Sequence, residues 1–114
     1  MKAKVLAIPE VIDYLYELVD ILYEKHYLGY KYNSVEYVIE LFEDIITNLP
    51  KKQHRPAPRY YDKYEKGMFY ALFRKNKHTQ YYAFFTKYNN NGETIYLVRY
   101  IGNNHTEAQH LDTY

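Results

Sequence analysis

The hydrophobic period of this chain changes from helical to strand-like between Pro50 and Gly67. Before Pro50, apolar residues recur every three or four positions, which is the spacing of a helix with one buried face. After Gly67, short runs rich in tyrosine, phenylalanine and valine are separated by turn residues, which is typical of β-strands. This order predicts an α+β fold in which helices are followed by a sheet.

Two helices are expected in the first half. The first apolar stripe covers residues 10 to about 27, and Gly29 interrupts it. A second helix is expected to start at Asn33, because Asn33 and Glu36 have the spacing of a capping box variant, and to stop before Pro50. Each stripe needs a partner, so the two helices should form an αα-hairpin that packs on a sheet.

Four strands are expected, at residues 4–8, 68–74, 79–88 and 94–101. The last three are consecutive and should form an antiparallel meander, with Asn91-Gly92 as the turn of its second hairpin. The first strand should join this meander at an edge or beside the last strand. The predicted order is therefore β-α-α-β-β-β in a single domain of 114 residues.

Two segments have no predicted helix or long strand. Residues 51–66 contain Pro56 and Pro58, which exclude a helix interior and a central strand, so this stretch is expected to be a loop. Residues 105–114 are a tail without a clear pattern.

The composition excludes several classes of site. The chain has no cysteine, so disulfides, thiolate metal sites and a cysteine nucleophile are ruled out. It has no nucleotide-binding glycine motif and no HExxH or GxSxG motif, and no metal or cofactor is expected. The first apolar run is too short for a signal peptide, and no run approaches the ~18–20 residues of a membrane span. A cytoplasmic protein without membrane contact is expected.

Charge is distributed unevenly, although the net charge is only +1. Residues 1–49 hold nine acids and four lysines, whereas residues 51–87 hold ten Lys/Arg and two acids. Tyrosines lie among these cations, and cations with aromatic rings are what a single-stranded nucleic acid needs. Alternatively, the lysines only keep loops and a sheet edge soluble. The candidate nucleic-acid contacts are Arg59, Lys63, Lys75, Lys77 and Tyr82.

This organisation resembles the RelE/ParE superfamily, the toxins of type II toxin–antitoxin pairs. The likeness is strongest in residues 69–75, 81–85 and 95–102. It implies a cognate antitoxin protein as partner. It also implies one of two activities, cleavage of mRNA on the ribosome or inhibition of gyrase.

In the cleaving members, basic residues on the middle strands and in the turn after the last strand surround the scissile phosphate. By position, Arg74 matches the basic residue that ends the second strand, while Gln80 or Tyr81 stands where an arginine often opens the third. Asn103 and Asn104 replace a usually basic turn, His105 lies beside them, and His110 falls near a C-terminal aromatic.

The resemblance implies a metal-independent endoribonuclease. The residues expected to transfer protons or stabilise charge are His105, His78, Arg74 and Arg99. Each histidine could equally be a surface residue, and Arg99 could be paired with a neighbouring carboxylate. The alternative function is a non-enzymatic binding protein of the same fold, either a gyrase-directed inhibitor or an inert relative. A plain RNA-binding domain is a third possibility.

Overall fold

The computed structural model describes residues 2–25 and 31–111, and its centre is a five-stranded mixed sheet. The strand order is β1-β5-β4-β3-β2. β1 runs parallel to β5, and the other neighbouring pairs are antiparallel. The predicted β-α-α-β-β-β order and the place of the first strand beside the last are confirmed. The strands are β1 (Lys2–Ala7), β2 (Arg55–Pro56), β3 (Phe69–Arg74), β4 (Gln80–Asn90) and β5 (Glu93–Asn103).

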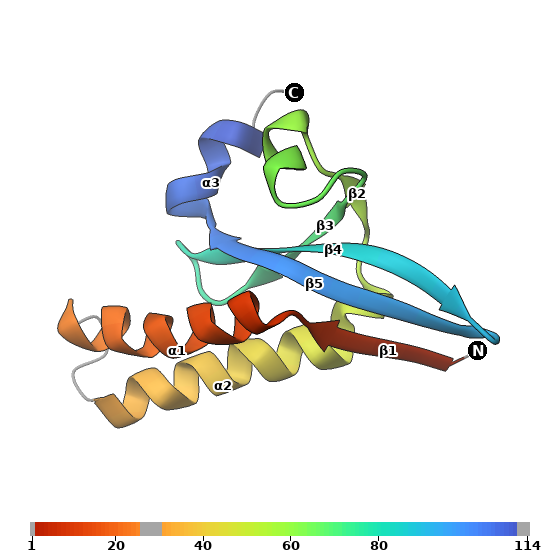
Figure 1. The fold of residues 1–114 in the computed structure, drawn as a ribbon. Helices are drawn as coiled ribbons and strands as arrows, with labels where there is room; N and C mark the ends of the chain where they lie inside the picture. Colours follow the sequence, from red (N-terminus) through yellow and green to blue (C-terminus); the bar gives the residue numbers. More distant parts are fainter. Residues whose placement is uncertain (1, 26–30, 112–114) are drawn as a thin grey trace.

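The helical hairpin covers one face of the sheet (Figure 1). α1 spans Pro9–Glu24, and Pro9 takes the first helical position, where a missing N–H costs no hydrogen bond. α2 spans Lys31–Asn48 and therefore begins two residues before the predicted Asn33. The expected end of the first helix at Tyr27 and the break at Gly29 lie outside the described residues. The predicted stripe is confirmed in α1, where the buried residues are Val11, Leu15, Leu18 and Leu22.

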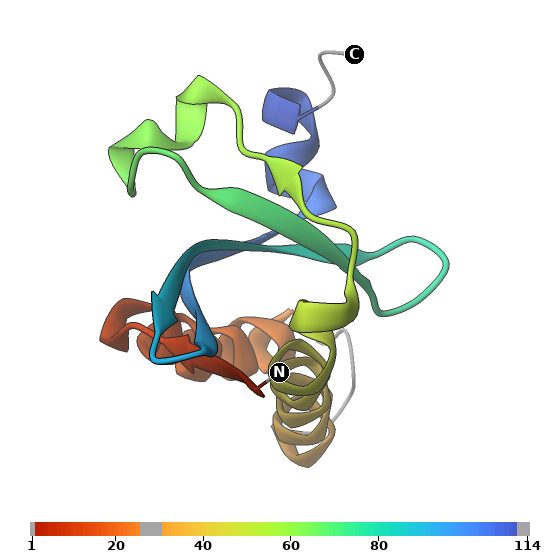
Figure 2. The same ribbon diagram turned by 90° about the vertical axis from the view of Figure 1, so that its right-hand side faces the viewer.

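The opposite face of the sheet is covered by two short helical elements that the sequence does not predict (Figures 1 and 2). The 3₁₀ helix η2, Arg59–Lys63, lies within the expected loop and buries Tyr61. The helix α3, Asn104–Leu111, lies within the expected tail and buries Glu107 and Leu111. A further 3₁₀ turn, η1, spans Leu49–Lys51. The sheet is thus a middle layer between the hairpin on one side and η2 with α3 on the other.

β4 is the central strand of the sheet and is covered on both faces. Five consecutive residues of β4, from 81 to 85, are buried. Tyr81, Ala83 and Phe85 belong to the core beneath the helical hairpin, whereas Tyr82 and Phe84 belong to the core beneath η2 and α3. Alternate side chains therefore enter two separate cores, as the pleat of a strand requires.

The turn between β4 and β5 is the one expected from Asn91-Gly92. Both residues have positive φ angles, 52° for Asn91 and 83° for Gly92. This is the conformation of a two-residue type I′ turn, whose twist matches that of the flanking strands. The turn fixes the register of the hairpin. β5 thereby delivers its last residue, Asn103, to the start of α3.

Candidate functional site

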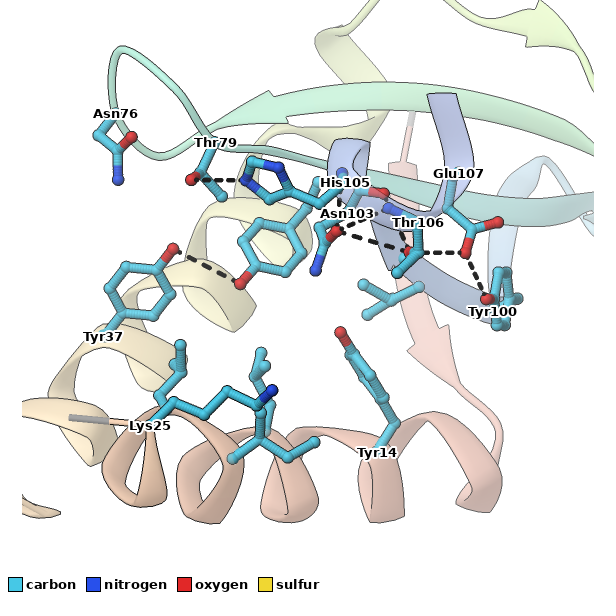
Figure 3. A pocket seen from close by; sticks show the side chains of 16 residues that line it. Tyr14, Lys25, Tyr37, Asn76, Thr79, Tyr100, Asn103, His105, Thr106 and Glu107 are labelled. Atoms are coloured by element: carbon cyan, nitrogen blue, oxygen red, sulfur yellow. Dashed lines mark hydrogen bonds between the residues drawn. The ribbon is translucent and has the colours of Figure 1, made fainter. Parts of the chain in front are cut away.

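A cleft of about 860 Å³ lies between the helical hairpin and the junction of β5 with α3 (Figure 3). α1 and α2 supply one wall, and the β3–β4 turn, the end of β5 and the first turn of α3 supply the other. Its polar and charged lining residues are Tyr14, Lys25, Tyr37, Asn76, Thr79, Tyr81, Tyr100, Asn103, His105, Thr106 and Glu107. Such a mixture of hydroxyl, imidazole, ammonium and carboxylate groups gives the cleft both hydrogen-bonding and proton-transfer capacity.

His105 enters the cleft from the first turn of α3. Asn103 caps this helix, because its side-chain oxygen accepts hydrogen bonds from the backbone N–H groups of His105 (2.9 Å) and Thr106 (3.2 Å). The Nε2 atom of His105 lies 3.5 Å from Oγ1 of Thr79. The imidazole is exposed and can therefore be reached from solvent.

Asn104 joins the start of α3 to the β3–β4 turn. Its side-chain oxygen accepts a hydrogen bond from the backbone N–H of Gln80 at 3.0 Å, and its side-chain nitrogen donates to the carbonyl oxygen of His78 at 3.1 Å. These two bonds bring the basic turn against the histidine-bearing helix. The neutral side chain of Asn104 therefore has a structural role, which is to hold the β3–β4 turn against the start of α3.

Glu107 is the carboxylate at the back of the cleft and is only 6% exposed. Oε1 accepts a hydrogen bond from the hydroxyl of Tyr61 at 2.8 Å. Oε2 accepts hydrogen bonds from the hydroxyls of Tyr100 at 2.8 Å and Thr106 at 3.0 Å. Three donors satisfy most of the acceptor capacity of this carboxylate, which makes its burial tolerable.

Two tyrosines of the cleft, Tyr14 and Tyr81, have raised pKa values and therefore keep their protons. Burial, with smaller contributions from Glu107 and Tyr37, raises the pKa of Tyr14 to about 12. Burial and the hydrogen bond with Tyr37, whose hydroxyl oxygen is 3.5 Å away, also raise the pKa of Tyr81. In Figure 3 the hydroxyl of Tyr14 points from α1 into the space below α3. At neutral pH these hydroxyls are hydrogen-bond donors, not bases.

The rim of the cleft is basic. The ammonium group of Lys75 lies 4.4 Å from the ring centre of Tyr37, which anchors the β3–β4 turn over α2 by a cation–π contact. Arg74, Lys77 and His78 belong to the same turn region and are exposed. Lys25 contributes a cation at the end of α1. Two of the candidate nucleic-acid contacts, Lys75 and Lys77, therefore belong to the turn beside the cleft.

Of the four predicted catalytic residues, only His105 lines the cleft. Arg74 and His78 lie beside it in the turn region, and the Nε group of Arg74 donates to the carbonyl oxygen of Asn76 at 3.3 Å. Arg99 is not brought to His105. Its guanidinium donates hydrogen bonds to Thr86 (3.0 Å) and Tyr88 (2.8 Å). It also lies 3.9 Å from the carboxylate of Glu65, as expected if Arg99 is paired with a neighbouring carboxylate and is not a catalytic residue.

The remaining predicted contacts fall elsewhere. Tyr82 is 7% exposed and packs edge-on against Tyr70 in the core, so the prediction that its ring stacks on a base is corrected. Arg59 and Lys63 are exposed on η2, on the face of the sheet opposite the hairpin. The ammonium group of Lys63 lies 3.8 Å from the ring centre of Tyr60, which in turn stacks on His110 at 3.5 Å. His110 therefore packs on η2 and does not line the cleft.

Several cleft residues are not predicted from the sequence, among them Tyr14, Thr79 and Glu107. Tyr14 stands at helical spacing from Val11 and Leu18, which could have placed it beside the buried stripe. Glu107 follows a capping asparagine in the first turn of a helix, a pattern that could have indicated α3. Thr79 carries no signal in the sequence, because only the fold brings it to His105.

Two properties of the described residues bear on the class of site. No group of three or more histidine, aspartate or glutamate side chains that could hold a metal ion occurs in residues 2–25 and 31–111. In the same residues, no helix has the length and hydropathy needed to cross a membrane.

The chain was compared with models of known protein families, with curated proteins and with solved structures, and none of these comparisons found a match.

Proposed function

We propose that this chain is the toxin of a type II toxin–antitoxin pair and cleaves mRNA bound to the ribosome. The observation that carries the proposal is the position of His105, which enters a cleft with a basic rim at the end of β5. The arrangement of the sheet, with β1 parallel to β5 and a helical hairpin on one face, agrees with the resemblance to the RelE/ParE superfamily.

The proposed reaction is attack of an RNA 2′-hydroxyl on the adjacent phosphate. A base removes the hydroxyl proton, a new P–O2′ bond forms, and the P–O5′ bond breaks as an acid protonates the leaving oxygen. The products are a 2′,3′-cyclic phosphate and a 5′-hydroxyl. Such a reaction needs a base and an acid that exchange protons near neutral pH, and cations that stabilise the negative charge of the transition state.

The residues of the cleft can be given these roles. His105 takes one of the two proton-transfer roles, since it is the histidine that lines the cleft among the described residues, and water takes the other. Lys25, which lines the cleft, and Lys75, which lies over the ring of the lining residue Tyr37, supply positive charge. The protonated hydroxyl of Tyr14 donates a hydrogen bond to a phosphate oxygen, which a tyrosine with a raised pKa does without losing its proton.

The second candidate is a non-enzymatic binding protein of the same fold, such as a gyrase-directed inhibitor. It is favoured by the position of Arg99, which makes its contacts outside the cleft. It is also favoured by the absence of a guanidinium group among the described residues that line the cleft. A cleft that binds an anionic partner without cleaving it needs only the lysines and hydroxyls.

The two candidates are separated by expression in cells that lack an antitoxin. The proposal predicts growth arrest, cleavage of translated mRNA mapped by primer extension, and suppression of both by co-expression of the cognate antitoxin. Growth arrest with intact mRNA and with inhibited DNA supercoiling would favour the gyrase-directed alternative. Normal growth and intact mRNA would reject the toxin proposal.

A further inference from the structure

A second concave surface lies on the helical hairpin, and it is apolar. It is a groove of about 530 Å³ between α1 and α2. Three of its side chains are unusually exposed for apolar residues, namely Tyr16 (73%), Ile39 (51%) and Val35 (36%). Ile12, Val19 and Phe42 are half-buried in its walls. Contiguous exposed apolar surface of this kind marks an interaction site more often than chance.

The groove is separate from the cleft that contains His105. The two share no lining residue among the described parts of the chain. On α1 the cleft uses Tyr14, Leu18 and Ile21, whereas the groove uses Ile12, Tyr16 and Val19, which lie on another side of the helix. An inference about the groove is therefore independent of the proposed function. A variant in the groove can leave the cleft intact.

The charges on the two helices that form the groove are almost all negative. α1 carries five acids and no lysine or arginine, and α2 carries four acids and the single cation Lys31. Helical spacing places Asp13, Glu17, Asp20 and Glu24 in one exposed row of α1. Glu36, Glu40 and Glu43 form a second exposed row on α2. An apolar groove between two acidic rows is complementary to an apolar ridge flanked by cations.

We infer that the hairpin groove, defined by Ile12, Tyr16, Val19, Val35, Ile39 and Phe42, binds a basic amphipathic helix of a partner protein. The apolar ridge of such a helix, with residues at i, i+3, i+4 and i+7, fills the groove, while its lysines and arginines face the two acidic rows. A second copy of this hairpin does not fit, because a symmetric dimer through this face would bring acidic rows together. The partner is thus basic, in contrast to an acidic segment that would cover the basic rim of the cleft.

Synthetic peptides test the inference directly. Three helical peptides of about four turns share one Leu ridge and differ only in their flanking residues, which are Lys/Arg, Gln or Glu. Fluorescence anisotropy with the full chain should show binding of the basic peptide at least about tenfold tighter than that of the neutral one. No binding of the acidic peptide is expected, and raising the salt from about 0.05 to about 0.5 M should weaken the basic complex.

Matched variants locate the binding. Ile39→Asp and Tyr16→Ala change exposed side chains of the groove and should each lower the affinity for the basic peptide at least about tenfold. Leu6→Glu changes an apolar residue of β1 that is 40% exposed and lies outside the groove, and it should leave the affinity unchanged. Circular dichroism checks that each variant is folded.

Four results would overturn the inference. One is binding of the Lys/Arg and Glu peptides with equal affinity, and another is a loss of affinity in Leu6→Glu as large as in Ile39→Asp. The third is a dimer in sedimentation analysis that Ile39→Asp converts to a monomer, since the groove would then hold a second copy of this chain. Failure of the peptide to bind at about 1 mM also rejects it.

Discussion

The hydroxyl of Tyr61 donates a 2.8 Å hydrogen bond to the carboxylate of Glu107, and both side chains are buried. Tyr61 belongs to η2 and Glu107 to α3, so the bond joins two elements that are 46 residues apart in sequence. Tyr61 also stacks on Phe84 of β4, with 4.2 Å between the ring centres. This pair therefore ties α3, which carries His105, to the centre of the sheet.

Glu107→Ala should lower the free energy of unfolding by about 1–3 kcal/mol, because it leaves the buried hydroxyl of Tyr61 without its acceptor. Tyr61→Phe removes only the donor and should cost about 0.5–1.5 kcal/mol. Gln109→Ala, at an exposed position of the same helix, is the control and should stay within about 0.5 kcal/mol of the parent. Urea denaturation measures the free energy of unfolding of all three variants. Equal stability of Glu107→Ala and the control would show that the Tyr61–Glu107 hydrogen bond does not stabilise the fold.

Gly102→Ala tests how tightly Glu107 is held. A Cβ atom at residue 102 would lie 2.5 Å from Cγ of Glu107, and the three hydrogen bonds of this carboxylate oppose its displacement. Gly102→Ala should therefore destabilise the fold by about 1–3 kcal/mol. In the background of Glu107→Ala the same change should cost much less, which a double-mutant cycle measures as a coupling energy. Additive effects would show that Glu107 moves aside freely.

Stability should fall at alkaline pH, because burial raises the pKa of four buried or partly buried tyrosines. The pKa of Tyr14 is 10.0 when unfolded and about 12 in the native state, so between these values the native state binds more protons. Its contribution is complete below pH 10 and is lost as the pH rises toward 12. Tyr61, Tyr81 and Tyr100 also have raised pKa values and act in the same direction. Denaturation between about pH 8 and pH 11 should show this decline, and Tyr14→Phe should make it shallower; an unchanged slope in Tyr14→Phe would contradict the assignment.

The two basic regions should contribute unequally to RNA binding. Lys75 and Lys77 belong to the turn at the rim of the cleft, whereas Arg59 and Lys63 lie on η2. The double variant Lys75→Ala, Lys77→Ala should bind RNA more weakly. The dependence of log affinity on log salt concentration should also become shallower, by about one for each phosphate that the protein no longer neutralises. Arg59→Ala with Lys63→Ala is the matched control of equal charge change. Equal weakening by the two pairs would mean that RNA does not enter through the rim.

Much of the fold could be predicted because local patterns determine it. The stripe of Val11, Leu15, Leu18 and Leu22 specifies a helix with one buried face, and Asn91-Gly92 specifies a tight hairpin. The hydrophobic pattern of α3 does not indicate a helix, because its two buried residues are Leu111 and the acid Glu107. Its stability depends on hydroxyl donors from η2 and β5, of which Tyr61 of η2 lies far away in sequence.

The site could be predicted only in part, since its residues meet through tertiary structure. His105 is predictable because it follows the last strand, and Lys75 and Lys77 because they lie in a basic turn. The basic and aromatic residues near Tyr82 in the sequence suggest that it lies on an RNA surface. The sequence does not show that η2 and α3 cover the face of β4 on which Tyr82 lies. Similarly, the contacts of Arg99 with Thr86 and Glu65 depend on strand register and on a distant loop.

Measuring mRNA cleavage on ribosomes tests whether His105 transfers protons in the proposed reaction. The proteins compared are the purified parent, His105→Ala and His78→Ala. Because His105 is exposed, its removal should change the free energy of unfolding by less than about 0.5 kcal/mol. His105→Ala should cleave about 10²- to 10⁴-fold more slowly than the parent. His78→Ala, in the turn outside the cleft lining, should cleave at nearly the parental rate. Equal cleavage rates for the parent and His105→Ala would contradict a role of His105 in proton transfer.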